Sequence, residues 1–341
     1  MTQASRVLVT GAAGMLGRKL CARLAREGRI GARAIATLIM TDLAPLAAPA
    51  RAGCRVETRR DDLTDPLTAA RLIALAPDVV LHLAATIERG VEASFEEGYA
   101  INFDAARRLF EAIRLRRRVA PDYFPRVVVT SSIGVYGPPF PGVIDDDFIL
   151  QPQTSYGAQK AMVELLLADY VRKGHFDGVA IRLPTIAVRP DRAHAGLTDV
   201  FSHILREPLR GLEARLPAQL DTPHWLASPR AAVGYVVHAA AMDPSALGAR
   251  RALTMPGVSA TLREEVEALR RVGGAAALAL LKTADDPRVE AMIAHSPARF
   301  SARRALALGF APDRDIDAIL RAFVEDDLAA APALMPAARG A

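Results

Sequence analysis

The sequence predicts an α/β protein in which a doubly wound parallel sheet carries a smaller, mostly helical unit. Three observations support this fold class. Short apolar runs alternate with amphipathic stretches along the first half of the 341-residue chain. A glycine-rich turn follows the first apolar run directly, and the alternation stops after Pro184, where a region rich in Pro, His and Arg begins.

The alternating segments define the expected elements, because strands separated by helices form parallel sheets with right-handed crossovers. The expected strands are Arg6–Thr10, Ile35–Thr41, Arg55–Arg59, Val79–His82, Arg126–Ser131 and Gly178–Leu183. The expected helices are Met15–Glu27, Leu67–Ala76, Glu97–Arg117 and Ser155–Lys173.

The second half predicts a return to the sheet and a second unit. Residues 186–227 are expected to form loops and short helices over a cleft, followed by a helix at Val233–Met242 and a strand at Arg251–Met255. A further helical part begins at Thr261–Val272. We expect a Rossmann domain of residues 1–185 plus about 228–260, a substrate domain of about 186–227 plus 261–330, and a frayed tail at 331–341.

The glycine turn is the first candidate site. Gly11, Gly14 and Gly17 follow the first strand and open the first helix, as in dinucleotide-binding turns. Gly11 permits the turn, Gly14 lets the backbone approach a pyrophosphate, and Gly17 lets helix and strand pack closely. Phosphates favour the helix N-terminus because of its N–H groups and dipole. A glycine-rich turn without a ligand is the alternative.

Asp42 ends the second strand, where such folds place the acid that accepts hydrogen bonds from the adenosine ribose. A carboxylate there repels a 2′-phosphate, and no basic residue follows nearby in the sequence. These features favour NAD over NADP as the cofactor. An Asp at a strand end is alternatively a simple turn former.

Tyr156 and Lys160 are the main catalytic candidates. Four residues apart on a helix, their side chains share one face. A nearby ammonium favours the phenolate, which makes a tyrosine, with its usual pKa of about 10, a usable proton acceptor. Only four of the 43 basic residues are lysines, so this spacing is unlikely to be a chance surface pair.

Composition disfavours several other functions. The net charge of +5 comes from arginines scattered along the chain, without a basic stripe interleaved with aromatics, which disfavours nucleic-acid binding. The two cysteines, Cys21 and Cys54, and the seven histidines lack metal-ligand spacing, so no metal site is expected. Neither a signal peptide nor an apolar stretch approaching ~18 residues is evident, and a cytoplasmic protein without membrane contact is expected.

Several motifs in one order resemble the extended short-chain dehydrogenase/reductases, relatives of nucleotide-sugar epimerases and dehydratases. They are GAAGMLG, MTD, DDLTD, HLAA, SSIGVYG, YGAQK and RLPT. The resemblance implies that Tyr156 is the proton acceptor, that Lys160 binds the nicotinamide ribose, and that Ser132 holds the substrate hydroxyl. A hydroxyl that only satisfies backbone groups at the strand end is the alternative for Ser132.

The resemblance also implies a set of cofactor contacts. Asp62 and Leu63 correspond to residues that line the adenine, and Pro184 and Thr185 to residues at the nicotinamide. The implied NAD-binding set is Gly11, Gly14, Met15, Leu16, Gly17, Asp42, Asp62, Leu63, Leu83, Ala84, Ala85, Tyr156, Lys160, Pro184 and Thr185. Met15 and Leu16 replace the Phe and Ile or Val of many relatives, a swap that conserves volume.

Segments outside the cofactor motifs resemble a branch of the family that oxidises four-carbon sugar acids. They are VIDDDFILQPQTSYGAQKAMVELLLADYVRKGHFDGVAIRLPTIAVRP, HWLASPRAAVGYVVHAA and LTMPGVSATLREEVEALRRVGG. The implied reaction is NAD-dependent oxidation at C2, giving a 2-oxo acid.

An anionic substrate needs a partner for its carboxylate, preferably an arginine fork. Four arginines lie near the expected cleft in the sequence: Arg182, Arg189, Arg192 and Arg230. Arg182 could instead form a structural ion pair, so Arg189 and Arg230 are favoured. His224 and Trp225 are expected to wall the same pocket, although a Trp is more often part of a core.

Three other functions stay open. A dehydratase usually carries an acid–base pair where this chain has Ile133 and Gly134, which disfavours dehydration. A nucleotide-sugar epimerase would use the same motifs, and an NAD-binding sensor typically lacks the Tyr–Lys pair. A homodimer is expected, because the helices near 100–117 and 157–172 carry apolar stripes that the sheet cannot cover and relatives pair through them.

Overall fold

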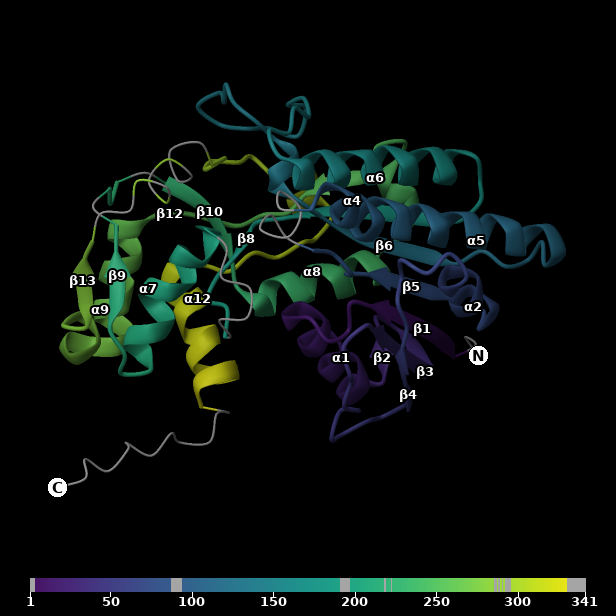
Figure 1. Cartoon of the computed structure of the whole chain (residues 1–341), viewed down its shortest axis with the longest axis horizontal. Coiled ribbons are helices and arrows are strands. Elements are labelled where there is room, and N and C mark those ends of the chain that lie inside the picture. Colours follow the sequence, from purple (N-terminus) through teal and green to yellow (C-terminus); the bar gives the residue numbers. More distant parts are fainter. Residues whose placement is uncertain are drawn as a thin grey trace.

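The computed structural model describes residues 4–86, 94–190, 197–217, 219–221, 223–284, 287, 289, 291 and 296–329. Its main sheet has eight strands, in the order β11-β7-β6-β5-β1-β3-β2, with β4 pairing β3 (Figure 1). The strands are β1 (Ser5–Thr10), β2 (Arg29–Ile30), β3 (Arg33–Asp42), β4 (Arg55–Arg60), β5 (Val79–His82), β6 (Arg126–Ser132), β7 (Asp177–Leu183) and β11 (Ala252–Thr254). All pair in parallel except the short β2, which confirms the predicted fold class.

Helices cover both faces of this sheet (Figure 1). On one face lie α2 (Thr68–Ala74), α4 (Phe95–Gly98), α5 (Ala105–Val119) and α6 (Ser155–Arg172), with a π-helical turn, Tyr99–Asp104, joining α4 to α5. On the other face lie α1 (Met15–Glu27) and α8 (Pro229–Ala241). The expected helix Glu97–Arg117 therefore exists as three consecutive pieces.

The helices that carry the candidate site begin at defined caps. The Thr154 side chain accepts a hydrogen bond from the Gly157 N–H at the start of α6. The Ser228 side chain does the same for the Ala231 N–H at the start of α8, with Pro229 as the first helical residue. Such caps satisfy N–H groups that the helix itself leaves unpaired.

The strand order reverses between β1 and β5. From β1 the chain proceeds to β3 on one side, and β5 lies on its other side. A crevice opens at such a switch point, outside the carboxyl ends of the strands. The glycine turn follows β1 directly, so it lies at this crevice.

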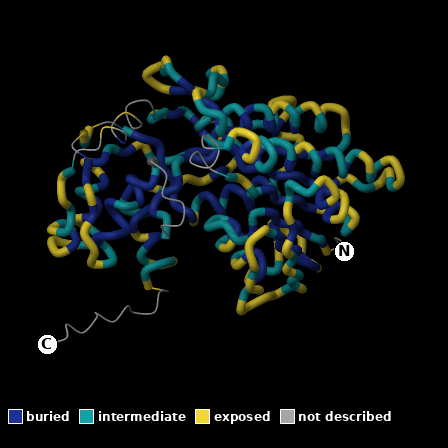
Figure 2. The backbone as a smooth tube through the Cα atoms, in the orientation of Figure 1, coloured by how far each residue is buried: buried dark blue, intermediate teal, exposed yellow. Residues whose placement is uncertain are grey.

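The second unit contains α7 (Val200–Leu209), α9 (Leu262–Leu278) and α12 (Ile316–Phe323), which surround a separate apolar core (Figure 2). Its strands form two small sheets, β12-β10-β8 and β13-β9. Their bounds are β8 (Thr185–Ile186), β9 (Ala214–Leu216), β10 (Pro223–Ala227), β12 (Val258–Thr261) and β13 (Leu281–Thr283), and α11 spans Arg303–Ala307.

The expectation of only loops and short helices over residues 186–227 is wrong, because β9 and β10 lie in this region. β10 pairs with β12, whose residues lie more than thirty positions later in the chain. Local patterning could not reveal a strand whose partners are so distant. The domain boundaries stay a prediction, and the tail at 331–341 lies outside the described residues.

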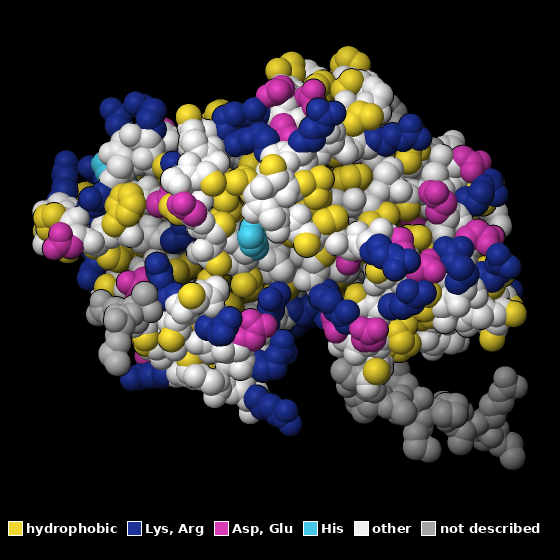
Figure 3. Space-filling model, turned by 180° about the vertical axis from the view of Figure 1, so that it is seen from behind, with side chains coloured by type: hydrophobic (Ala, Val, Ile, Leu, Met, Phe, Trp, Pro, Cys, Tyr) yellow, Lys and Arg dark blue, Asp and Glu magenta, His cyan; other side chains and the backbone are white. Residues whose placement is uncertain are grey.

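The surface gives two further observations. On the face drawn in Figure 3, Lys and Arg side chains are dispersed among Asp and Glu instead of forming one stripe. Among the residues described, no helix combines the length and the apolar character needed to cross a membrane.

Candidate active site

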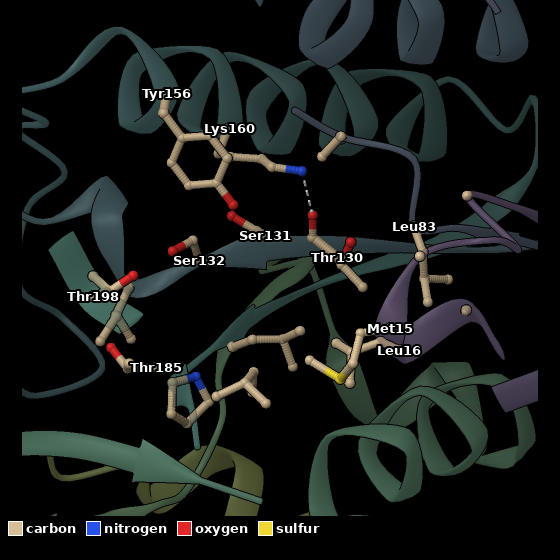
Figure 4. Close-up of a pocket in the computed structure, with 18 of the residues that line it drawn as sticks. Met15, Leu16, Leu83, Thr130, Ser131, Ser132, Tyr156, Lys160, Thr185 and Thr198 are labelled. Carbon is tan, nitrogen blue, oxygen red and sulfur yellow. Dashed lines mark hydrogen bonds between the residues drawn. The ribbon is translucent and has the colours of Figure 1, made fainter. Parts of the chain in front are cut away.

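One pocket gathers most of the candidate residues at the carboxyl ends of β1, β5, β6 and β7 (Figure 4). Tyr156 and Lys160 project into it from α6, on the side opposite Met15 and Leu16 of the glycine turn. Its lining comprises Gly11, Gly14, Met15, Leu16, Gly17, Leu83, Ala85, Thr130, Ser131, Ser132, Ile133, Tyr156, Lys160, Leu183, Pro184, Thr185, Ile186, Arg189 and Thr198.

The glycine turn fits a dinucleotide. A Cβ on Gly11 would lie 2.5 Å from the backbone N of Ala84, and a Cβ on Gly17 would overlap the carbonyl oxygen of Gly11. Gly14 lines the pocket, and only the Gly11 oxygen, at 3.3 Å, would lie near a Cβ placed on it. No side chain caps α1 at Gly14, and the first residues of the helix line the pocket, so its N-terminal N–H groups are available to a pyrophosphate.

Asp42 supports this turn from the end of β3. One carboxylate oxygen accepts the Ala13 N–H at 2.9 Å, and the other accepts the Ala44 N–H at 3.0 Å. The strand register places Arg60 of β4 opposite Asp42, and Arg60 Nε donates to the Leu43 carbonyl at 3.0 Å. The sequence around Asp42 gave no sign of this basic neighbour, because parallel pairing of β3 with β4 brings Arg60 there.

Four residues of the implied cofactor set are not among the described lining residues: Asp42, described above, and Asp62, Leu63 and Ala84. Asp62 is exposed, and its Oδ1 accepts the N–H and the hydroxyl of Thr64, as a turn former does. Leu63 packs beside the core under α2 and α5. Ala84 contributes through its backbone, against which Gly11 packs. Their cofactor contacts stay predictions.

Lys160 lines the pocket, although its exposed fraction is only 4 %. Its Nζ donates to the Thr130 carbonyl at 2.9 Å and lies 5.7 Å from the centre of the Tyr156 ring. Burial lowers the pKa of Lys160 to about 8, although the nearby Glu164 carboxylate opposes the shift. Lys160 therefore stays an ammonium at neutral pH, but its pKa lies much closer to neutral pH than that of an ordinary lysine.

Ser132 and Tyr156 both lie against Gly134. The Ser132 Oγ accepts the Gly134 N–H at 3.0 Å. A Cβ on Gly134 would lie 3.3 Å from that Oγ and 3.7 Å from the Tyr156 ring, so a side chain here would crowd both groups. Ser132 therefore does satisfy a backbone group at the end of its strand, as the alternative interpretation expected. Its hydroxyl can still donate a hydrogen bond to a substrate while it accepts this one.

A buried polar network lies behind the catalytic candidates. The Glu164 carboxylate accepts hydrogen bonds from Ser131 Oγ at 2.5 Å and from the Arg182 guanidinium at 2.7 Å. Arg182 also donates to the Tyr136 hydroxyl at 2.6 Å. Arg182 is therefore a structural ion pair. Glu164 is not among the residues predicted from the sequence, although its place one turn after Lys160 was a usable signal.

His82 belongs to the same buried layer, at the end of β5. Its Nδ1 shares a 2.7 Å hydrogen bond with Thr10 Oγ1. Burial, and then the nearby Lys160, lower the pKa of His82 to about 3, which keeps the ring neutral. A neutral ring adds no second positive charge beside the Lys160 ammonium.

Arg189 reaches the pocket from the loop after β8. Its guanidinium donates to the Ile186 carbonyl at 3.3 Å and to Thr198 Oγ1 at 3.4 Å. Thr198 also lines the pocket, from the short 3₁₀ turn Leu197–Asp199. Nothing in the sequence signalled Thr198, because loop folding alone brings it to Arg189. Arg192 lies outside the described residues.

Arg230 is not where the sequence led us to expect it. It extends from α8 to the C-terminal π-helical turn Val324–Leu328, where it pairs with Asp326 at 2.6 Å and Glu325 at 2.8 Å. These acids lie some 95 residues away in the chain. The expectation that Arg230 binds the substrate carboxylate is therefore wrong, because its guanidinium pairs with these acids outside the pocket.

His224 and Trp225 are also absent from the described lining. His224 is buried, pairs with Glu265 of α9 and stacks on Phe201 of α7. Trp225 is buried in an aromatic cluster, and its Nε1 donates to the Met255 carbonyl at 3.2 Å. His224 thus packs between α7 and α9 of the second unit, and Trp225 packs in a separate cluster with Tyr136 and Phe300, which corrects their expected place on the pocket wall.

Comparison with known families matches this arrangement. The model of the NAD dependent epimerase/dehydratase family matches residues 7–221, which span the glycine turn and the Tyr156–Lys160 pair. The chain belongs to this family. The predicted cofactor, NAD, and the predicted enzymatic character are thereby confirmed.

Individual relatives align with nearly the whole length of this chain. D-erythronate dehydrogenase of Cupriavidus necator is 42% identical over 94% of this chain and 98% of its own length. The protein of the same name from Haemophilus influenzae is 33% identical over 95% of this chain and 100% of its own. A solved structure described as a nucleoside-diphosphate-sugar epimerase, from Agrobacterium tumefaciens, matches with a TM-score of 0.93 at 44% identity, covering 96% of each chain.

Proposed function

We propose that this protein oxidises the C2 hydroxyl of a four-carbon sugar acid with NAD, converting D-erythronate to 2-dehydro-D-erythronate. The observation that carries the proposal is the composition of one pocket. Its lining includes a glycine turn that fits NAD, the Ser132–Tyr156–Lys160 group, and the Arg189 guanidinium. The relatives named D-erythronate dehydrogenase support the choice of substrate, because they align along almost the whole chain.

The chemistry assigns one task to each side chain. Ser132 and Tyr156 hydrogen-bond the C2 hydroxyl and hold it in a reactive orientation. NAD, when bound, supplies the ring carbon that accepts the hydride. Tyr156 accepts the hydroxyl proton, and the Lys160 ammonium favours the phenolate form that makes this possible. Lys160 donates to the Thr130 carbonyl, which fixes its Nζ beneath the Tyr156 ring.

Arg189 provides the contact that selects an acid. Of the arginines that the sequence offered, it is the one whose described position lines the pocket. A guanidinium binds a carboxylate through two parallel hydrogen bonds, so it orients the substrate as well as attracting it. The carboxylate is attached directly to C2, so fixing it also restricts where the C2 hydroxyl can lie.

We also propose a homodimer formed through α5 and α6. Leu115 of α5 is 46% exposed and Leu165 of α6 is 68% exposed, although both helices pack against the sheet with their other faces. Large apolar side chains that remain exposed on adjacent helices favour association. Light scattering at micromolar concentration is expected to give twice the chain mass, and a monomer would refute this part of the proposal.

The substrate is tested by offering C3 to C6 sugar acids with NAD and following NADH absorbance. We expect a clear preference for D-erythronate over its stereoisomers and over longer acids. A UDP-sugar is included, because brisk conversion of it without activity on any acid would replace the proposal with epimerisation. NAD binding without turnover of either class would instead indicate a sensor.

A further inference from the structure

Arg206 of α7 is the largest side chain that is completely buried among the described residues. Its two terminal nitrogens donate to the two carboxylate oxygens of Asp199, at 3.1 and 3.0 Å. Its Nε donates to Glu207 at 2.8 Å. Three charged groups thus share one interior site next to the substrate side of the pocket.

These charges hold the chain segment that carries Arg189. Arg206 Nη1 also donates to the Arg189 carbonyl at 3.1 Å, and the Arg189 N–H donates to Ser202 Oγ at 3.0 Å. Arg210, which directly follows α7, donates to the Pro190 carbonyl. The backbone of Arg189 is therefore bound to α7 at both its N–H and its carbonyl.

The same arginine holds the other pocket-lining residue of this segment. Asp199 directly follows Thr198, whose hydroxyl accepts a hydrogen bond from the Arg189 guanidinium. Arg206 thus bonds the carbonyl of Arg189 on one side and the carboxylate next to Thr198 on the other. A single guanidinium sets the separation of the two polar groups on the substrate side.

Stability alone does not explain this arrangement. Removing charges from water is costly, and well-packed apolar residues often replace buried ion pairs without loss of stability. Apolar residues could not bond a backbone carbonyl and a carboxylate at once. Binding sites need this kind of support, since a displacement of about 1 Å can cost roughly 100-fold in rate.

We propose that Arg206, together with Asp199, is a positioning residue that sets the Arg189–Thr198 pair to receive the substrate carboxylate. Arg206 does not line the pocket, so within the part of the chain that the structure describes it acts through Arg189 and through Asp199 next to Thr198. The inference rests on the proposed oxidation of a sugar acid and adds to it the origin of the preference for an acid over an uncharged analogue.

The test compares Arg206→Lys with the parent enzyme on two substrates, D-erythronate and its uncharged amide. Lysine keeps the charge but lacks the fork, so it cannot bond Asp199, Glu207 and the Arg189 carbonyl together. We expect the ratio of kcat/KM for acid over amide to fall about 10- to 100-fold, mainly through KM for the acid. NAD affinity, measured by fluorescence, is expected to stay unchanged. Arg271→Lys, at an exposed pair with Asp317, is the matched control.

Three outcomes are decisive. An equal loss of kcat/KM on acid and amide in Arg206→Lys would show that Arg206 has a purely structural role and would overturn the inference. The proposed function would still stand, because the parent enzyme oxidises the acid. If the parent oxidises neither compound, the proposed function itself fails. Should Arg206→Lys not fold, Asp199→Asn leaves Arg206 in place and removes the charge that its fork binds, and an unchanged acid-to-amide ratio in that variant overturns the inference.

Discussion

The two sides of the pocket are built in different ways. On the cofactor side, backbone packs on backbone: Gly11 and Gly17 leave no room for a Cβ. On the substrate side, side-chain charges do the holding, through Arg206 and its carboxylate partners. Cofactor binding should therefore be lost when atoms are added to the glycine turn, whereas substrate binding should be lost when a charge or a hydrogen bond is removed.

Helix α6 joins the two sides, because Tyr156 and Lys160 must serve the cofactor and the substrate together. We expect Tyr156→Phe to lower kcat by about 10²- to 10⁴-fold, since the proton acceptor is lost. NAD affinity should change little. The control is Tyr170→Phe on the same helix, whose hydroxyl donates to Glu111 away from the pocket. Near-normal turnover by Tyr156→Phe would remove the phenol from the mechanism.

The cofactor side is tested by adding one methyl group. Gly17→Ala forces a Cβ into the carbonyl oxygen of Gly11, so the turn must open or the helix must shift. We expect NAD affinity to fall about 100-fold or the protein to lose stability, because rigid backbone cannot give way. Gly142→Ala is the control, as nothing lies within 4 Å of its added Cβ. Unchanged NAD binding in Gly17→Ala would contradict the close packing seen here.

The substrate side is tested by removing a charge. Arg189→Met is expected to raise KM for D-erythronate about 10- to 100-fold, the value of one or two charged hydrogen bonds, while NAD affinity holds. Arg230→Met removes a charge of the same kind outside the pocket and should leave KM within about twofold. If the two variants behave alike, Arg189 is not the carboxylate ligand.

Lys160, on the helix that joins the two sides, makes the free energy of unfolding depend on pH. Because burial lowers the pKa of Lys160 from its usual 10.5 to about 8, the unfolded chain holds its proton to higher pH than the folded one. The cost of burying the charge is therefore present below pH 8 and disappears as the pH rises towards 10.5. Between about pH 8 and pH 10 we expect the parent to gain about 2 kcal/mol of unfolding free energy relative to Lys160→Met. Denaturant unfolding of both proteins measures this, and parallel pH curves would show an unshifted lysine.

Much of the cofactor side could be predicted from the sequence because its determinants are local. Gly11, Gly14 and Gly17 follow a strand that its apolar pattern already reveals, and Tyr156 and Lys160 share a face by helical geometry. The substrate side could not be predicted so well. The sequence offered Arg189 and Arg230 as equal candidates, and it gave no signal for Thr198 or for the partners of Arg206.

Local patterns account for most strands and helices of the first 185 residues, for the place of the glycine turn and for the helix that presents the phenol and the ammonium, because neighbours within a few residues decide these features. They did not reveal β9 and β10, whose pairing partners lie far away in the chain. The tertiary structure alone decided which guanidinium enters the pocket. Arg230 is drawn away by acids near the C-terminus, while Arg206 and Ser202 of α7 hold Arg189 in place. The orientation of a long arginine side chain depends on its ion-pair and hydrogen-bond partners, and partners that are distant in the sequence come together only after the chain has folded.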